Sequence, residues 1–220
     1  MVYKIADFLF QIDSLPESVK KFCRGYEADN FAAVDAKIEV VKGDVEYEQR
    51  AAESFNMMDA DYDDCFGLAF YRKICAEVLQ RDAFMMHGAV IEYEGKGYLF
   101  TAKSGTGKTT HIRLWKKLFG EDKVYAYGTP WCGKEGYNTN TRVPLAGICF
   151  LERNEENSIK KISDTEALPR LLSQIMVHDS ADLARQLELV DALFERVPTY
   201  LLKCSIDIEA ARVAYLGMNK

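Results

Sequence analysis

The spacing of apolar and polar residues along this chain predicts a mixture of strands and helices. Residues 3–12 and 34–41 alternate with a partial period of two, which is typical of strands, and a short helix is expected between them. Between residues 62 and 81, apolar side chains recur every four positions, which predicts one face of a helix. The run 84–95 predicts a strand that leads to a glycine turn, and 98–102 predicts a short buried strand.

The second half of the chain continues the same mixture. Its expected elements are, in order, a helix at 108–119, a strand at 123–127, a loop at 128–142, a strand at 143–153, helices at 164–177 and 181–195, a strand at 197–206 and a closing helix at 207–217. No repeat, low-complexity segment or obvious linker interrupts the pattern. We therefore expect one mixed α/β domain over residues 1–220, with a strand-rich sub-region at 1–60 and a core at 84–165.

Composition narrows the classes of protein that fit. A net charge of −6 argues against nucleic acid as a partner, because phosphate backbones select basic surfaces. The first residues carry acids and lack a long apolar core, so we expect no signal peptide, and no run approaches the roughly 20 apolar residues that cross a membrane. The six cysteines form no C-x-x-C pair, and their spacing offers no zinc site. We expect a reduced, cytoplasmic protein whose cysteines are mostly small buried hydrophobes.

One stretch, A-K-S-G-T-G-K-T from Ala102 to Thr109, follows the G-x-x-x-x-G-K-[ST] pattern of phosphate-binding loops, with Ala102 in place of the first glycine. Backbone N–H groups of such a loop, together with the helix that follows, form a cradle for an anion. In that pattern Lys108 contacts the β- and γ-phosphates and the hydroxyl of Thr109 binds Mg²⁺. The alternative is a glycine-rich turn that binds nothing. The residues expected to bind the nucleotide are Ser104, Gly105, Thr106, Gly107, Lys108, Thr109 and Thr110.

Two longer stretches, "HGAVIEYEGKGYLFTAKSGTGKTT" and "YGTPWCGKEGYNTNTRVPLAGICFLER", resemble the superfamily of HPr serine kinase/phosphorylase and phosphoenolpyruvate carboxykinase. They are most similar to small bacterial kinase-like proteins of gene clusters that make modified peptides. The resemblance covers roughly residues 84–165. It implies a phosphoenolpyruvate-carboxykinase-like P-loop fold, with a mixed, partly antiparallel sheet flanked by helices. It also implies that His87 lies beside the transferred phosphate, whereas a lone histidine here would be a core or turn residue.

The resemblance implies an ATP- and Mg²⁺-dependent kinase with Lys108 and His87 as its catalytic residues. The acceptor would be a hydroxyl of a peptide, small protein or serine-like metabolite, and a homo-oligomer is compatible with it. A carboxykinase-like metabolic enzyme is a weaker alternative. In those families an acidic strand end follows the helix after the phosphate loop. Here the segment from Gly120 to Gly128 has room for one short strand only. A nucleotide-binding module, scaffold or sensor without transfer activity is therefore the main alternative.

Other side chains are candidates for the missing roles. The acids that remain in place of the missing acidic strand end include Asp122, Glu135, Glu152 and Asp164. The loop at 128–142 offers Trp131, Lys134 and Arg142 as contacts to base, phosphate or acceptor, although we expect Trp131 to pack on the sheet instead. His111 would touch the nucleotide or pack, and His178 would face solvent. No residue is assigned as the general base.

Overall fold

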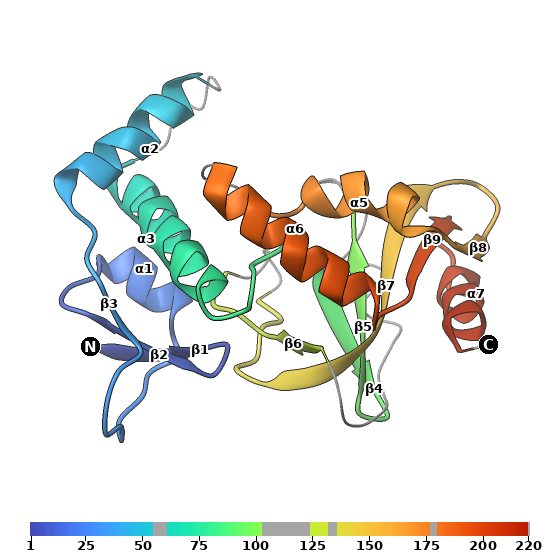
Figure 1. The fold of residues 1–220 in the computed structure, drawn as a ribbon, viewed down its shortest axis with the longest axis horizontal. Coiled ribbons are helices and arrows are strands. Elements are labelled where there is room, and N and C mark those ends of the chain that lie inside the picture. The colour runs from blue at the N-terminus through green and yellow to red at the C-terminus, as the bar shows by residue number, and fades with distance from the viewer. Residues whose placement is uncertain (55–60, 103–123, 132–135, 177–179, 220) are drawn as a thin grey trace. The chain divides into compact units, whose positions relative to one another are not determined.

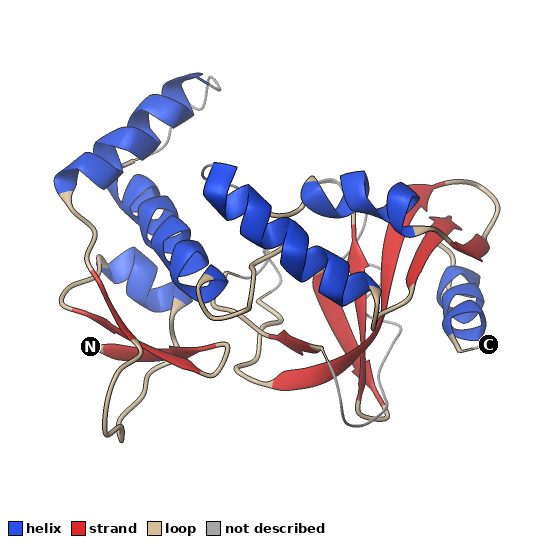
Figure 2. Ribbon diagram, in the orientation of Figure 1, coloured by secondary structure: helices blue, strands red, loops and turns tan. Residues whose placement is uncertain are grey.

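The computed structural model describes residues 1–54, 61–102, 124–131, 136–176 and 180–219. It is a mixed α/β protein with a mixed sheet flanked by helices, as Figures 1 and 2 show. The chain divides into two compact units. Unit 1 comprises Met1–Ala83 with Tyr127–Thr141, and unit 2 comprises Phe84–Ala126 with Arg142–Lys220. The segment 127–141, which lies in sequence between two strands of unit 2, is therefore part of unit 1.

Unit 1 has a three-stranded sheet in the order β1-β2-β3. Its elements are β1 (Val2–Ile5), β2 (Phe8–Ile12), α1 (Glu17–Phe22), β3 (Ala36–Ile38), α2 (Lys42–Ser54) and α3 (Tyr62–Leu79). Strands β1 and β2 are antiparallel, and β2 and β3 are parallel. The prediction of one strand over 3–12 was wrong. Ala6 and Asp7 have φ of 55° and 66°, so they form a tight turn that folds the run into a hairpin.

Helix α3 was predicted, and its first turn explains where it begins. Asp61 and Asp64 form a reciprocal capping box, in which the N–H of Asp64 donates to Oδ1 of Asp61 at 2.8 Å. The expected apolar face is buried, with Phe70 and Ile74 fully excluded from solvent. Helix α2 was not predicted, because Val45 is its only buried residue and no apolar stripe marks it.

Unit 2 contains the larger sheet, in the order β4-β5-β7-β9-β8, with β6 paired to β7. The strands are β4 (Ala89–Tyr93), β5 (Lys96–Thr101), β6 (Tyr125–Tyr127), β7 (Arg142–Arg153), β8 (Ser158–Lys161) and β9 (Thr199–Cys204). Strands β5, β7 and β9 are mutually parallel, whereas β4 and β8 run antiparallel to β5 and β9. The expected mixed, partly antiparallel sheet is confirmed. Strand β8 was not predicted; it is a short edge strand with mostly exposed residues.

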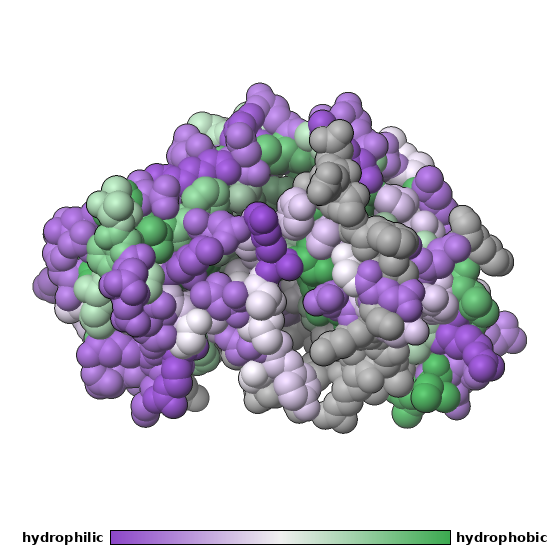
Figure 3. All heavy atoms as spheres, turned by 90° about the horizontal axis from the view of Figure 1, so that it is seen from below, coloured by the Kyte–Doolittle hydropathy of each residue, from purple (hydrophilic) through white to green (hydrophobic). Residues whose placement is uncertain are grey.

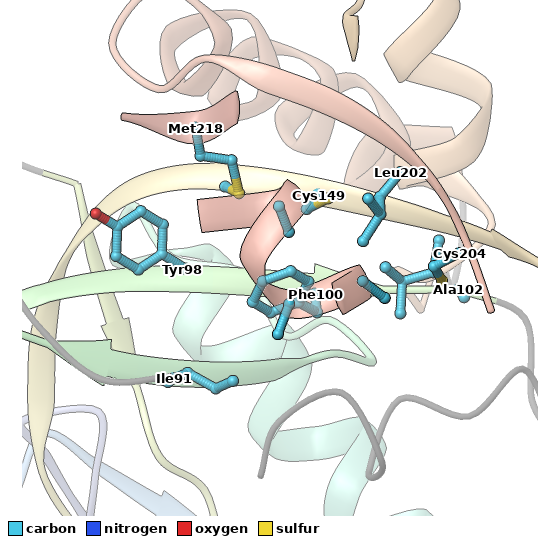
Figure 4. Packing of buried hydrophobic residues seen from close by; sticks show 12 residues of the cluster. Ile91, Tyr98, Phe100, Ala102, Cys149, Leu202, Cys204 and Met218 are labelled. Carbon is cyan, nitrogen blue, oxygen red and sulfur yellow. The ribbon is translucent and has the colours of Figure 1, made fainter. Parts of the chain in front are cut away.

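Helices cover both faces of this sheet. The three described helices of unit 2 are α5 (Asp164–Leu172), α6 (Ser180–Phe194) and α7 (Glu209–Met218). One core joins α5 and α6 to one face; its members include Leu99, Ile148, Phe150, Leu171, Val190 and Leu201. The other core joins α7 to the opposite face; its members include Tyr98, Phe100, Cys149, Leu202, Ala214 and Met218 (Figure 4). The helix predicted at 108–119 lies outside the described residues.

Hydrophilic and hydrophobic residues are unevenly distributed on the surface. Most of the described atoms on the face drawn in Figure 3 belong to hydrophilic residues, with hydrophobic ones in smaller patches between them. Within the described ranges, none of the helices combines the length and the apolar character that crossing a bilayer requires.

Candidate nucleotide-binding site

The candidate site begins where β5 ends. Strand β5 lies between β4 and β7, and Phe100, Thr101 and Ala102 are all buried. Ala102 is also the first residue of the phosphate-loop pattern, so the pattern starts at the carboxyl end of an interior strand. In α/β sheets, ligands bind outside the carboxyl ends of such strands. The residues of the pattern from 103 onward, including Ser104, Gly105, Thr106, Gly107, Lys108, Thr109 and Thr110, lie outside the described residues.

The structure places His87 beside this carboxyl end of β5. The hydroxyl of Thr101 donates a hydrogen bond to the main-chain oxygen of His87 at 2.8 Å. On its other side, the N–H of His87 donates to the main-chain oxygen of Gln174 at 2.8 Å, and Met86 forms a bridge with Ile175. The main chain of His87 is thus fixed between β5 and the segment that follows α5. Its side chain is exposed, so His87 is not a core histidine.

Gly88 leaves room for the side chain of Leu99. A Cβ at this position would lie 2.6 Å from Cδ1 of Leu99 and 3.4 Å from the main-chain oxygen of Phe100. A larger residue would therefore displace the end of the Leu99 side chain, whereas the distance to the oxygen is ordinary contact. The dipeptide His87-Gly88 combines an exposed imidazole with close packing on Leu99, at the point where β5 leads into the phosphate-loop pattern.

Glu152 is the carboxylate on the strand next to β5. Phe150 of β7 is paired with Thr101, so Glu152, two residues further, lies beyond the end of β5 and on the same face of the sheet as Thr101. Its Oε1 accepts a hydrogen bond from Arg170 of α5 at 2.8 Å. Both side chains are at least a third exposed, and pairs of this kind contribute about 0–1 kcal/mol.

The structure does not place the other three candidate acids beside Glu152. Asp164 is the first residue of α5 and is exposed, as an acid in a first helical turn usually is. Asp122 and Glu135 lie outside the described residues. Across the part of the chain that the structure describes, no group of three or more His, Cys, Asp or Glu side chains is arranged to hold a metal ion.

The loop at 128–142, which was predicted to supply further contacts, belongs to unit 1 up to Thr141. The ring of Trp131 packs against Phe70 and Tyr71 of α3, with centroids 5.7 Å and 4.9 Å away. The expectation that Trp131 packs on the sheet was therefore wrong, because a helix of unit 1 supplies the aromatic surface. At the end of the loop, Nδ2 of Asn140 donates to the main-chain oxygens of Lys4 at 3.1 Å and Gly25 at 3.3 Å. Lys134 lies outside the described residues.

Arg142 is not part of the candidate site. It is the first residue of β7, and β7 runs parallel to β5, with Leu145 paired to Gly97 near the start of β5. Arg142 consequently lies at the amino-terminal ends of these parallel strands, whereas Thr101 lies at the carboxyl end of β5. Its guanidinium stacks over the ring of Tyr125 of the same unit, 4.8 Å from the centroid. The prediction that Arg142 contacts base, phosphate or acceptor was wrong for this reason.

The described cysteines are structural. Five of them are buried and in no disulfide bond, which confirms their predicted role as small hydrophobes: Cys23, Cys65, Cys75, Cys149 and Cys204. Burial raises the pKa of Cys23 to about 12 and also raises the pKa of Cys149, so neither thiol is activated. Cys132, His111 and His178 lie outside the described residues.

Comparisons with family models, with curated proteins and with solved structures find no match to this chain.

Proposed function

We propose that this protein is an ATP-dependent phosphotransferase with a phosphoenolpyruvate-carboxykinase-like P-loop fold. It would move the γ-phosphate of ATP to a hydroxyl of a peptide, small protein or serine-like metabolite. The observation that carries the proposal is the hydrogen bond between Thr101 and His87. It brings the exposed histidine next to the strand that leads directly into the phosphate-loop pattern. The mixed sheet and the resemblance of residues 84–165 support the same function.

In the proposed reaction, the phosphate loop and His87 have separate roles. Main-chain N–H groups of the loop and the side chain of Lys108 would hold the phosphates, and the hydroxyl of Thr109 would hold Mg²⁺, which would offset phosphate charge. His87 orients the acceptor and takes its hydroxyl proton. The acceptor oxygen then forms a bond to the γ-phosphorus as the bond from that phosphorus to the bridging oxygen breaks, and ADP leaves. Histidine is the side chain that most often takes a proton in this way.

A transfer assay tests the proposal. The full chain is incubated with γ-labelled ATP, Mg²⁺ and a panel of serine- and threonine-containing peptides, small proteins and free serine. We expect label on at least one acceptor. His87→Gln should abolish transfer while ATP still binds, and Lys108→Ala should abolish both. Transfer that is unchanged in His87→Gln would contradict the role given to His87, and no label on any acceptor would contradict the transferase.

A second candidate function is a nucleotide-binding module without transfer activity. The observation that favours it is the state of Glu152, the carboxylate beside the end of β5, which is already paired with Arg170. Among the described residues no further acids converge there to bind a metal. Saturable binding of Mg·ATP with no turnover on the acceptor panel would support the module, whereas labelled acceptor would reject it.

A further inference from the structure

Thr101 is a polar residue in a place where apolar residues are the rule. It is the last residue of β5, and its exposed fraction is 0%. Its neighbours in the strand, Leu99 and Phe100, belong to the two apolar cores. A buried hydroxyl is costly unless it is hydrogen-bonded, and here the partner is the main-chain oxygen of His87 at 2.8 Å.

This bond completes a clamp on the main chain of His87. The oxygen of His87 accepts from Thr101, and its N–H donates to the oxygen of Gln174, also at 2.8 Å. Both main-chain polar groups of His87 are therefore bonded, to two different parts of unit 2. Gly88 adds the close packing against Leu99 described above. The main chain is held while the imidazole remains exposed, which is the arrangement expected of a side chain that acts on a ligand.

We infer that Thr101 is a positioning residue that holds His87 in place for phosphoryl transfer. The inference rests on the proposed function. The residue after Thr101 is Ala102, the first residue of the phosphate-loop pattern. One side chain therefore ties the main chain of His87 to the end of β5, the strand that leads into the pattern. Small errors in the position of a reacting group lower the rate of the chemical step much more than they lower binding.

The chain contains a matched control for this role. Thr199, the first residue of β9, is 2% exposed, and its hydroxyl donates to the main-chain oxygen of Ile162 at 3.2 Å. Thr199→Val therefore removes the same kind of buried bond in the same sheet. Thr199 lies two strands across from β5, where it is aligned through Ile148 with Leu99, and its bond goes to a different partner from that of Thr101.

The first arm of the test needs no nucleotide. Hydrogen exchange of the His87 amide is measured in the full chain, relative to exchange limited by global unfolding. Thr101→Val should speed exchange at His87 about tenfold, since a buried hydrogen bond to the adjacent carbonyl is lost. Thr101→Ser should restore slow exchange, and Thr199→Val should leave His87 unchanged. Equal effects of Thr101→Val and Thr199→Val at His87, or no effect of either, would overturn the inference. If Thr101→Val does not fold, Thr101→Cys replaces it, because a thiol is a much weaker donor.

The second arm measures transfer. Thr101→Val should lower kcat at least about tenfold while KM for ATP stays within about twofold, because the loss affects the reacting geometry and not ATP binding. Thr101→Ser should recover most of kcat, and Thr199→Val should match the wild type. A raised KM for ATP with an unchanged kcat would overturn the positioning role. If the wild type transfers no phosphate, the proposed function fails, and the exchange arm still decides whether Thr101 holds His87.

Discussion

Replacement of Gly128 by alanine tests how the segment 127–141 is built. A Cβ at Gly128 would lie 1.9 Å from the main-chain oxygen of Thr139 and 3.0 Å from its carbonyl carbon. The obstacle is backbone, so no side-chain rotation relieves it. The N–H of Gly128 also donates to the main-chain oxygen of Thr141 at 3.0 Å, and a displaced backbone would lose this bond. Overpacking costs about 1–3 kcal/mol and a lost hydrogen bond about 1 kcal/mol, so we expect unfolding to become easier by about 2–4 kcal/mol.

Gly43 provides the control for this prediction. It lies in α2 of the same unit, and a Cβ there would meet nothing within 4 Å. Gly43→Ala makes the same chemical change and should stabilise by up to about 1 kcal/mol, because alanine is the better helix former. Urea unfolding is followed by circular dichroism and by the fluorescence of Trp131, which packs within unit 1, in a Trp115→Phe background. A Gly128→Ala variant that matches the wild type or Gly43→Ala within 0.5 kcal/mol, roughly the usual scatter of surface substitutions, would refute the reasoning.

Three further predictions concern other parts of the molecule. In a Cys132→Ser background, none of the five buried cysteines should react with an aromatic disulfide reagent at pH 8, and all five should react in urea; fast labelling of the native protein would contradict their burial. Because burial raises the pKa of Cys23 from 9.0 to about 12, its contribution to stability is complete below pH 9 and is lost as the pH rises toward 12; Cys23→Ala should therefore reduce the fall in unfolding free energy over that range. Arg170→Met should change the unfolding free energy in urea by less than about 1 kcal/mol, since its pair with Glu152 is partly exposed; a loss above 3 kcal/mol would show that the pair is buried.

Elements with a strong apolar period could be predicted from the sequence, and those set by backbone details could not. Helix α3 and strands β5 and β7 were found because their buried faces or runs are long. The turn at Ala6 and Asp7 was missed because alanine rarely adopts the positive φ that Ala6 has here, and Asp7 alone is a weak turn signal. Helix α2 was missed because it buries only Val45 and is joined to α3 largely by charged pairs, such as Asp44 with Lys73 at 2.8 Å, which leave no apolar period.

The position of His87 beside the end of β5 could have been predicted from the length of the hairpin that β4 and β5 form. Glu94 and Gly95, with φ of 59° and 73°, form a two-residue hairpin turn, so counting back along the two strands places His87 beside the end of β5. The sequence alone pointed to this only through the resemblance. By contrast, the pair of Glu152 and Arg170 depends on the parallel register and on the packing of α5, which no local pattern encodes.

The measurement that tests the central claim most directly is a calorimetric titration of the full chain with Mg·ATP, alongside Lys108→Ala. If the chain holds a nucleotide at the end of β5, the wild type binds Mg·ATP at one saturable site. Lys108→Ala then weakens binding at least about tenfold, because a charged contact to the phosphates is lost. No saturable heat with the wild type, or equal binding by the wild type and Lys108→Ala, would contradict the account.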